Sequence, residues 1–522
     1  MSNNNEPLVL TIDYGTQSVR AMLFDKEGND HGKLKISFVP YYSKKVGWAE
    51  QSPDLYWEKL CEATQGLKAK VGNELWDRIE AVAVTTIRDT VVIVDKDGKP
   101  LRPVILWLDQ REIENPEKHI PSGLKALLKA VKMYETALTQ CRTTPCNWVH
   151  ENEPKVWEKM YKYLLFSGYI NLKMTGEFKD SIANQIGHIP FDYKNKAWNG
   201  PHALTSPLYD ITEKYMPELV ETGNIIGRIT EEAARDTGIK VGMAVVASGS
   251  DKGCETLGSG CFDSRGASLS FGTTATVQMT VDRYIEPEMF VPSYPAVLPG
   301  KYNPEIEIFR GYWMLSWFKQ EFAQKEVKEA EAMGISAEEL LNLHLKDVPA
   351  GCDGLILQPY WTPGIRHPNA RGAILGFSDC HTRAHLYRAI IEGIGFGLYD
   401  GLLAIEKKAK TTVEFLTVSG GGSQSEEICQ ITANLMGKPV KKAQTYETSS
   451  LGAAITAFTA LRVYQSFEEA AKNMVRHTKT YEPNMKEHEF YLRLYKDIYK
   501  NIYPNNKKLY DKIKRIQEEY NV

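Results

Sequence analysis

Acidic residues that follow apolar stretches are the first candidates for chemistry in this chain. Asp13 ends the apolar stretch 8–13, and Gly15, Thr16 and Gln17 follow it. A glycine-containing turn lets backbone N–H groups approach an anion, and the Thr16 hydroxyl adds a donor. Asp13 would then reach a metal-bound phosphate through water. The alternative is an Asp that only organises a hairpin.

A second acid stands at the end of another apolar stretch. Residues 242–250, "GMAVVASGS", predict a strand that ends at Asp251. A carboxylate at the carboxyl end of a strand, facing a crevice, is well placed to act as a general base. A helix N-cap without a catalytic role is the alternative for Asp251.

Charged and aromatic residues interrupt or follow further apolar stretches. Arg88 and Asp89 stand between "AVAVTTI" and "TVVIV", where a plain turn would favour Gly or Asn. Arg donates and Asp accepts, which suits a vicinal diol; a surface salt bridge is the alternative. Trp107 and Asp109 follow another apolar run. Trp107 offers either an apolar wall for sugar C–H groups or ordinary core packing, and Asp109 is a hydroxyl acceptor.

Two glycine-containing segments lie in the later half. Gly272, Thr273 and Thr274, in "SFGTTA", repeat the parts of the first turn without its acid. The segment 418–427, "VSGGGSQSEE", is a strand, a glycine run and a helix start, where a helix dipole favours negative charge. Its spacing does not match G-x-G-x-x-G, and a flexible hinge is the alternative to a nucleotide site.

Composition excludes several classes of protein. The 522 residues exceed one compact core, so two or more domains are expected. The net charge of -3 gives no basic field for nucleic acid. The opening "MSNNNEPLVLTIDYG" lacks the regions of a signal peptide, and no run of about 18 apolar residues predicts a membrane span. Eight scattered cysteines without C-x-x-C indicate reduced thiols in a cytoplasmic protein.

The elements that must position these residues follow from periodicity. Residues 8–13, 18–25 and 33–40 predict an antiparallel meander, and Ser52 and Pro53 begin a helix over 54–71. Strand 78–86 follows. We expect residues 151–240 to be mostly helical with loops, and the charged tail from residue 482 to be a helix with a solvated face.

The stretch 266–282 echoes the stretch 9–25 as strand, Gly-Thr turn and strand. This weak internal repeat predicts two related halves that meet near residue 262. We therefore expect an α/β protein with domains at 1–262 and 263–522.

Several segments together resemble the FGGY carbohydrate kinase family, within the sugar kinase, actin and heat-shock chaperone superfamily. The resemblance extends over nearly the whole chain. It rests on these stretches: "DYGTQSVRAMLFD", "GWAEQSPDLYW", "DKDGKPLRPVILWLDQR", "SFGTTA", "GAILGFSDCHTRAHLYRAIIEG", "SGGGSQSEEICQITANLMGKPV" and "ETSSLGAAITA".

The resemblance implies two ribonuclease-H-like, actin-like ATPase domains flanking a deep cleft, with sugar mainly on the N-terminal domain and ATP with Mg²⁺ mainly on the C-terminal one. It implies metal binding by Asp13 and Asp251, proton abstraction by Asp251, and sugar contacts from Arg88, Asp89, Trp107, Asp109 and Asp251. The nucleotide contacts it implies are Gly15, Thr16, Gln17, Arg20, Gly272, Thr273, Thr274, Gly420, Gly421, Gly422, Gln424 and Asn434.

The substrate is left open by conflicting features. Where this chain has Arg88-Asp89-Thr90, xylulose kinases usually show Met-His-Gly and glycerol kinases Arg-Glu-Thr, whereas other segments resemble the xylulose branch. We expect phosphorylation of a ketopentose such as xylulose, with glycerol, another short polyol or a linear autoinducer sugar as alternatives. A superfamily ATPase or a sugar-binding regulator without kinase activity is the alternative of another class. We expect neither nucleic acid nor membrane partners, and a homodimer is one of the oligomeric states left open.

Overall fold

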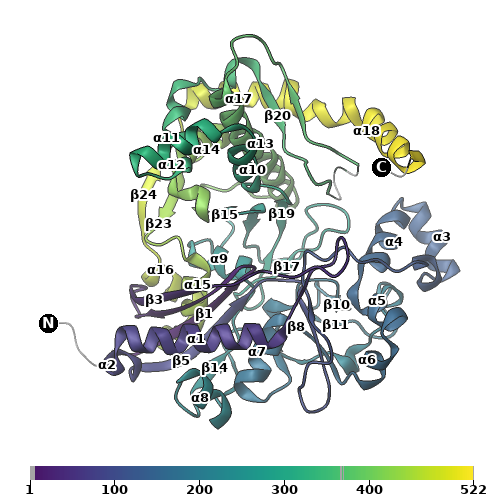
Figure 1. The fold of residues 1–522 in the computed structure, drawn as a ribbon, viewed down its shortest axis with the longest axis vertical. Coiled ribbons are helices and arrows are strands. Elements are labelled where there is room, and N and C mark those ends of the chain that lie inside the picture. The colour runs from purple at the N-terminus through teal and green to yellow at the C-terminus, as the bar shows by residue number, and fades with distance from the viewer. Residues whose placement is uncertain (1–5, 365–366, 368, 521–522) are drawn as a thin grey trace. The chain divides into compact units, whose positions relative to one another are not determined.

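The chain forms two compact units in the computed structural model, which describes residues 6–364, 367 and 369–520 (Figure 1). The first unit comprises Met1–Gly258, Tyr294–Tyr302 and Ser449–Val475. The second comprises Ser259–Ser293, Asn303–Thr448 and Arg476–Val522. Two later segments thus belong to the first unit, and residue 262 stays our proposal for where the two sequence halves meet.

A six-stranded mixed sheet forms the centre of the first unit, in the order β13-β14-β5-β1-β2-β3. Its strands are β1 (Leu8–Gly15), β2 (Ser18–Phe24), β3 (Asp30–Ser37), β5 (Ile79–Thr86), β13 (Ile225–Arg228) and β14 (Ala244–Val246). The predicted meander is confirmed: β1 pairs antiparallel with β2, and β2 with β3. β1 and β14 pair parallel with β5. The last residues of β1 and β5 therefore reach the same edge of the sheet.

The second unit is built on a sheet with the same pairing pattern, β19-β16-β15-β22-β23-β24. Its strands are β15 (Gly266–Phe271), β16 (Ala275–Met279), β19 (Glu305–Ile308), β22 (Phe415–Ser419), β23 (Val440–Ala443) and β24 (His477–Tyr481). From β19 onward, two antiparallel pairings are followed by two parallel pairings and one antiparallel pairing. The first sheet, read from β3, has the same sequence of pairings. This order confirms the internal repeat that the sequence predicted.

The helices follow the apolar spacing of the sequence. In α1 (Pro53–Val71), one face carries the buried residues, which include Tyr56, Leu60 and Leu67, and the helix packs on β2 and β3. Ser52 is at the N-cap position, but its side chain makes no capping hydrogen bond, contrary to expectation. In the second unit, Thr382 occupies the N-cap position of α13 (Arg383–Ala409), and its backbone N–H donates to His385 Nδ1 at 3.2 Å.

The remaining elements are short or peripheral. In the first unit they are β4 (Glu50–Gln51), β6 (Val91–Val94), β7 (Val104–Ile105), β8 (Lys162–Leu165), β9 (Lys179–Ser181), β10 (Phe191–Asp192), β11 (Ala197–Trp198), β12 (Glu218–Val220), β17 (Tyr294–Pro295), α2 (Asn73–Trp76), α3 (Ser122–Ala130), α4 (Tyr134–Thr143), α5 (Pro145–Asn152), α6 (Pro154–Lys159), α7 (Phe166–Thr175), α8 (Glu231–Thr237), α9 (Asp251–Gly258), almost all of α15 (Thr448–Ala460), and α16 (Phe467–Met474). The hairpin partner of β17 is β18 (Tyr302–Asn303), and the second unit adds β20 (Ile356–Gln358), β21 (Ala373–Leu375), α10 (Trp313–Phe322), α11 (Gln324–Met333), α12 (Ala337–Leu343), α14 (Glu426–Met436), α17 (Met485–Leu494), a π-helix (Tyr495–Tyr499) and α18 (Lys500–Tyr520).

The prediction for residues 151–240 is wrong, because short strands and irregular segments occupy much of this region alongside α6, α7 and α8. Proline and glycine interrupt the apolar runs before a helical period is complete. Within the part of the chain that the structure describes, no helix combines the length and apolar character of a membrane span.

A buried carboxylate holds this irregular region together. Asp180 has no exposed surface. Burial raises its pKa, and the hydrogen bonds to its oxygens lower it in part. The five donors to the Asp180 oxygens are the Ser167 hydroxyl (2.6 Å), the Asn171 amide (3.1 Å), the Ser181 backbone N–H (2.8 Å), the Asn184 amide (3.0 Å) and the Gln185 amide (2.8 Å). Asp180 thereby joins α7 to the loop 181–188.

That loop holds two segments that carry candidate site residues. The Ala183 carbonyl accepts the Ser250 N–H at 3.3 Å, immediately before α9. The Ile186 carbonyl accepts the Asp89 N–H at 3.1 Å. Asp180 therefore supports both segments through one loop.

We predict that Asp180→Ala lowers the free energy of unfolding of the first unit by about 3 kcal/mol or more, because it leaves several buried donors without their acceptor. Urea unfolding followed by tryptophan fluorescence measures the change. Asp192→Ala is the matched control, because the Asp192 carboxylate accepts its three bonds in an exposed turn. Equal midpoints for the two variants would contradict the assignment.

Candidate functional site

Asp251 begins helix α9 in the first unit. The preceding strand β14 ends at Val246, so the predicted strand does not extend to Asp251. Asp251 instead lies at the start of a helix, as the alternative interpretation held. The Lys252 N–H donates to Asp251 Oδ1 at 2.8 Å. Burial raises the pKa of Asp251, while Arg88 and Lys252 act in the opposite direction. The side chain keeps 27% of its surface exposed, so it is a carboxylate of raised pKa that solvent still reaches.

The structure brings Arg88 close to Asp251. Arg88 Nε lies 4.0 Å from Asp251 Oδ1, and the guanidinium lies 5.4 Å from the centre of the Tyr294 ring. Tyr294 also packs edge-on against Tyr193 at 5.6 Å between ring centres. Two aromatic rings therefore help to orient the guanidinium beside the candidate base.

The carboxylate of Asp89, the neighbour of Arg88, contacts His188 of the same unit. Asp89 Oδ1 accepts the His188 backbone N–H at 2.8 Å, and Oδ2 lies 2.6 Å from His188 Nδ1. His188 Nε2 lies 3.4 Å from the Thr143 hydroxyl. Both oxygens of Asp89 therefore have a protein partner, and its predicted contact with a sugar hydroxyl stays a prediction.

The geometry of this pair depends on two unusual backbone positions. Asp89 has a positive φ of 48°, which costs energy for a residue with a side chain. Gly187 has a φ of 152°, and a Cβ atom there would lie 2.4 Å from Asp89 Oδ1. Glycine is therefore required at 187 for the Asp89 carboxylate to reach His188.

The two partners shift each other's pKa. Burial alone would raise the pKa of Asp89, but the charge and hydrogen bonds of His188 lower it below its ordinary value. Burial would lower the pKa of His188, but Asp89 raises it above its ordinary value. The pair thus favours a carboxylate next to an imidazolium.

The first turn and the Trp107 segment meet in the structure. The Trp107 indole N–H donates to the Thr16 hydroxyl at 3.2 Å. Asp13 lies opposite Arg20 in the β1–β2 ladder, and Arg20 Nη1 lies 3.4 Å from Asp13 Oδ2. Asp13 is 6% exposed, and Gln17 is exposed at the tip of the turn. Asp13, Thr16, Arg20 and Trp107 therefore belong to one constellation.

Asp109 holds the segment after Trp107. Its carboxylate accepts the Ala49 N–H at 2.6 Å and three bonds from Arg111, at 2.7, 2.8 and 2.9 Å. The Arg111 guanidinium lies beside the rings of Trp48 and Trp148, at 4.2 and 4.6 Å from their centres. Asp109 has a clear structural role, and its predicted contact with a sugar stays a prediction.

In the second unit, the two glycine-containing segments pack together. The turn Gly272–Thr274 joins β15 to β16, and the glycine run follows β22, which pairs with β15. A Cβ atom at Gly420 would lie 3.0 Å from the backbone of Phe271, and one at Gly422 would lie 2.6 Å from the Tyr312 ring. At Gly421 a Cβ atom would meet no atom within 4 Å. The space beside Gly421 is therefore open.

The helix after this run, α14, begins at Glu426. Residues Gly421–Gln424 form a 3₁₀ turn, and Ser425 caps α14 through the Ile428 N–H at 3.2 Å. Gln424 is exposed beside the glycines. Asn434 is two turns farther along α14 and binds Glu487 of α17 at 2.8 Å, so the structure does not bring it to the glycine run.

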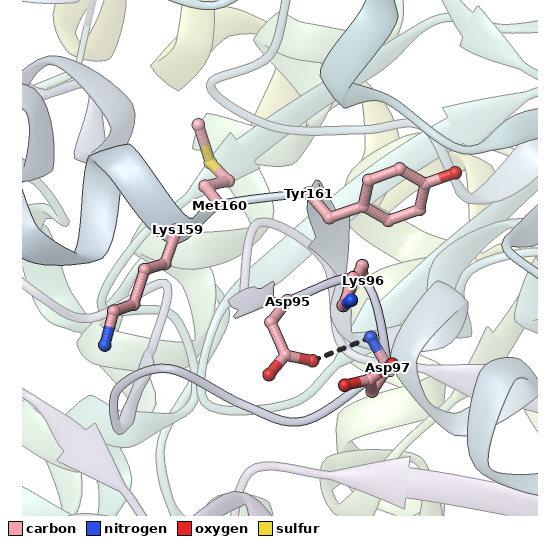
Figure 2. Close-up of a pocket in the computed structure, with 6 residues that line it drawn as sticks. All are labelled: Asp95, Lys96, Asp97, Lys159, Met160 and Tyr161. Carbon is pink, nitrogen blue, oxygen red and sulfur yellow. Dashed lines mark hydrogen bonds between the residues drawn. The ribbon is translucent and has the colours of Figure 1, made fainter.

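A hollow elsewhere on the first unit contains none of these residues. It has a volume of about 360 Å³ and is lined by Asp95, Lys96, Asp97, Lys159, Met160 and Tyr161 (Figure 2). The Asp95 carboxylate accepts the Asp97 N–H within its own turn at 2.9 Å. We assign this hollow no role. Among the described residues, no group of three or more His, Cys, Asp and Glu could hold a metal ion by itself.

Sequence reasoning missed His188, Tyr193 and Tyr294. His188 is 99 residues from Asp89 in the chain, so no local pattern connects them. The one available indication was the Gly187-His188 pair, because glycine often marks a close approach of the backbone.

Comparisons with known proteins agree with this arrangement. The N-terminal domain of the FGGY family of carbohydrate kinases matches residues 8–258, and the C-terminal domain of that family matches residues 267–461. The uncharacterized sugar kinase YgcE of Escherichia coli is 28% identical over 95% of this chain and 93% of that protein. A xylulose kinase of Bacillus subtilis is 27% identical over 98% of this chain and 99% of that protein.

The fold is shared with a solved structure. The crystal structure of xylulose kinase from Rhodospirillum rubrum superposes with a TM-score of 0.81 at 24% identity, over 97% of this chain and all of that one. Both domain matches, in order and over most of the chain, lead to one conclusion: the protein belongs to the FGGY family of carbohydrate kinases and is a sugar kinase with that family's two-domain fold.

Proposed function

We propose that this kinase uses ATP to phosphorylate a hydroxyl of a small sugar or polyol, with a ketopentose such as xylulose as the leading substrate. The similarity to xylulose kinases supports the sugar class. One observation carries the proposal: Asp251 is a partly exposed carboxylate of raised pKa, 4.0 Å from the Arg88 guanidinium. A base and a hydrogen-bond donor side by side suit the activation of a sugar hydroxyl.

In this proposal Asp251 accepts the proton of the attacking hydroxyl. A raised pKa makes Asp251 a better proton acceptor than an ordinary aspartate. Arg88 donates to a neighbouring oxygen of the sugar and so orients it. Positioning and charge stabilisation supply most of the catalysis in phosphoryl transfer.

The Asp89–His188 pair bears on the substrate class. Because both Asp89 oxygens are bound to His188, the group placed beside Asp251 is a donor, the Arg88 guanidinium. A ketose carbonyl accepts hydrogen bonds and cannot donate them. This favours a ketose over glycerol, although the Arg88-Asp89-Thr90 segment, similar to glycerol kinases, keeps a short polyol as the second candidate.

The second unit would contact the nucleotide through Gly272, Thr273, Thr274, the run at Gly421 and Gln424. Magnesium in such sites is held by one or two carboxylates, water and the phosphates themselves. Asp13, within β1, and Asp251, at the start of α9, are carboxylates of the first unit that fit this requirement without a larger acidic cluster. Bound magnesium would neutralise the charge of the transferring phosphoryl group.

The test is an assay of ADP release coupled to NADH oxidation, over ketopentoses, aldonates, tetritols and glycerol. We expect the highest kcat/KM for a ketopentose. Sugar-independent ADP release with no sugar phosphate formed would support an ATPase of another class, and no release with any sugar would support a sugar-binding regulator.

We predict that Asp251→Asn lowers kcat by about 10²-fold or more, because the amide cannot accept the proton. Activity of the parent enzyme should fall as acid protonates Asp251, at a pH above the ordinary aspartate pKa of 3.8, since that pKa is raised. Steady-state kinetics across pH measures both effects. Asp97→Asn, in an exposed turn, is the control. Unchanged turnover in Asp251→Asn would remove Asp251 from this role.

We predict that Arg88→Ala raises KM for the sugar much more than KM for ATP, because the guanidinium is beside Asp251 and within the first unit. Initial rates with each substrate varied in turn measure the two constants. Arg88→Lys should recover part of the loss by restoring one charged donor. Equal increases in both constants would contradict a sugar contact.

We predict that His188→Gln lowers the melting temperature more at about pH 5.5 than at about pH 8.5. The raised His188 pKa gives stability that is fully present below the ordinary value of 6.5 and is lost as pH rises through the folded-state value. The lowered Asp89 pKa gives stability that is lost only in stronger acid, as pH falls through its folded-state value.

Differential scanning fluorimetry at both pH values measures this difference. His202→Gln is the control, because His202 is exposed. A loss for His188→Gln that is the same at both pH values would contradict an ion pair and indicate packing alone.

A further inference from the structure

The helix that begins at Asp251 is held by a segment 198 residues later in the chain. This segment is the start of α15 (Thr448–Ala460), which belongs to the first unit from Ser449 onward, as α9 does (Figure 1). The Ser449 hydroxyl donates to the Asp251 carbonyl oxygen at 3.1 Å. Ser449 is therefore hydrogen-bonded to the backbone of the candidate base itself.

A glycine one turn after Ser449 brings the two helices into backbone contact. A Cβ atom at Gly452 would lie 2.0 Å from the Cys254 carbonyl oxygen and 2.8 Å from Cys254 Cα. Backbone atoms cannot turn aside as the end of a flexible side chain can, so the close approach requires glycine. Gly452 thus lets the first turn of α15 lie against the first turn of α9, where the Ser449 hydroxyl reaches the Asp251 carbonyl.

The other bonds at this end of α9 act on the preceding residue. Ser250 Oγ accepts the Gly253 N–H at 3.3 Å, and the Ser250 N–H donates to the Ala183 carbonyl at 3.3 Å. These bonds fix residue 250, whereas the Ser449 bond fixes residue 251. Because a hydrogen bond weakens steeply when its angle departs from the preferred one, rotation of the first turn of α9 would weaken the Ser449 bond.

We propose that Ser449 is a positioning residue for the kinase reaction: its hydroxyl fixes the rotation of the first turn of α9 and so aims the Asp251 carboxylate at the attacking hydroxyl. The proposal rests on the proposed role of Asp251 as the base. A general base acts only within hydrogen-bonding distance of the proton that it removes, so a small displacement lowers the rate. Ser449 acts through Asp251 in this role and contacts no substrate.

The first test compares two replacements of Ser449 in the full-length enzyme. Ser449→Ala should lower kcat by about tenfold and change KM for the sugar and for ATP by less than about twofold, because orientation affects the chemical step and not substrate binding. Ser449→Thr, which keeps a hydroxyl, should recover part of the lost kcat.

Thr459→Ala is the matched control in the same helix. Thr459 is half-buried like Ser449, but its hydroxyl donates to the Ile455 carbonyl at 2.8 Å within α15. This variant should leave kcat unchanged. Differential scanning fluorimetry of each variant shows that it is folded at the temperature of the assay.

A double-mutant cycle with Asp251→Asn separates positioning from a general loss of stability. If Ser449 acts through the Asp251 carboxylate, Ser449→Ala should lower kcat only while that carboxylate is present. Added to Asp251→Asn, it should therefore change the residual rate by less than about twofold.

The outcomes distinguish this proposal from the proposed base. Normal kcat in Ser449→Ala, with Asp251→Asn impaired, would overturn the positioning role and leave the base in place. A loss of equal size with and without the Asp251 carboxylate would also overturn it, and would indicate a structural role alone. Normal kcat in Asp251→Asn would instead refute the base, and the role of Ser449 with it.

Discussion

The candidate sugar side of this kinase depends on one buried carboxylate. Asp180 has no exposed surface and accepts five hydrogen bonds, and these fix the loop 181–188 against α7. The backbone of that loop then bonds to Asp89 on one side and to Ser250 on the other. An interior charge is tolerated only when its hydrogen-bonding capacity is nearly filled. The same bonds that make Asp180 tolerable therefore set the distance between the segment that carries Arg88 and the helix that begins at Asp251.

The adjacent residues Arg88 and Asp89 have different roles because of this loop. Asp89 adopts a left-handed backbone conformation, which turns its carboxylate towards His188 and leaves Arg88 next to Asp251. The strain at Asp89 and the requirement for glycine at 187 are costs that the ion pair with His188 offsets. In the structure, Asp89 is anchored to His188 and Arg88 lies beside Asp251, and the contact of either residue with a sugar stays a prediction.

The parts that the sequence predicted are those with a short repeat. The meander of β1 to β3 and the helix α1 each follow from residues a few positions apart. The strand-and-turn echo at 9–25 and 266–282 was enough to predict two related sheets. The parts that it did not predict depend on distant partners. Asp251 was expected at a strand end, yet the chain already turns after Val246 and a helix begins at Asp251. Ser52 has the right type for an N-cap and makes no capping bond, because residue type alone does not fix the side-chain torsion.

The repeated sheet also explains why the first unit has an aspartate, Asp13, at a position where the second unit has a serine, Ser270. The end of β1 and the start of the turn after it read Asp13-Tyr14-Gly15-Thr16, and the end of β15 and the turn after it read Ser270-Phe271-Gly272-Thr273. In the ladders, Asp13 is paired with Thr85 of β5 and Ser270 with Ser419 of β22, so the two positions are equivalent. A phosphate chain needs donors along its length, but a carboxylate only where a metal is to be held, since elsewhere it would repel the phosphates. One scaffold thus gives two equivalent turns, which we propose face the phosphates. The single difference between serine and aspartate, balanced by Arg20 on the next strand, would give the metal-binding role to the half that also holds Asp251.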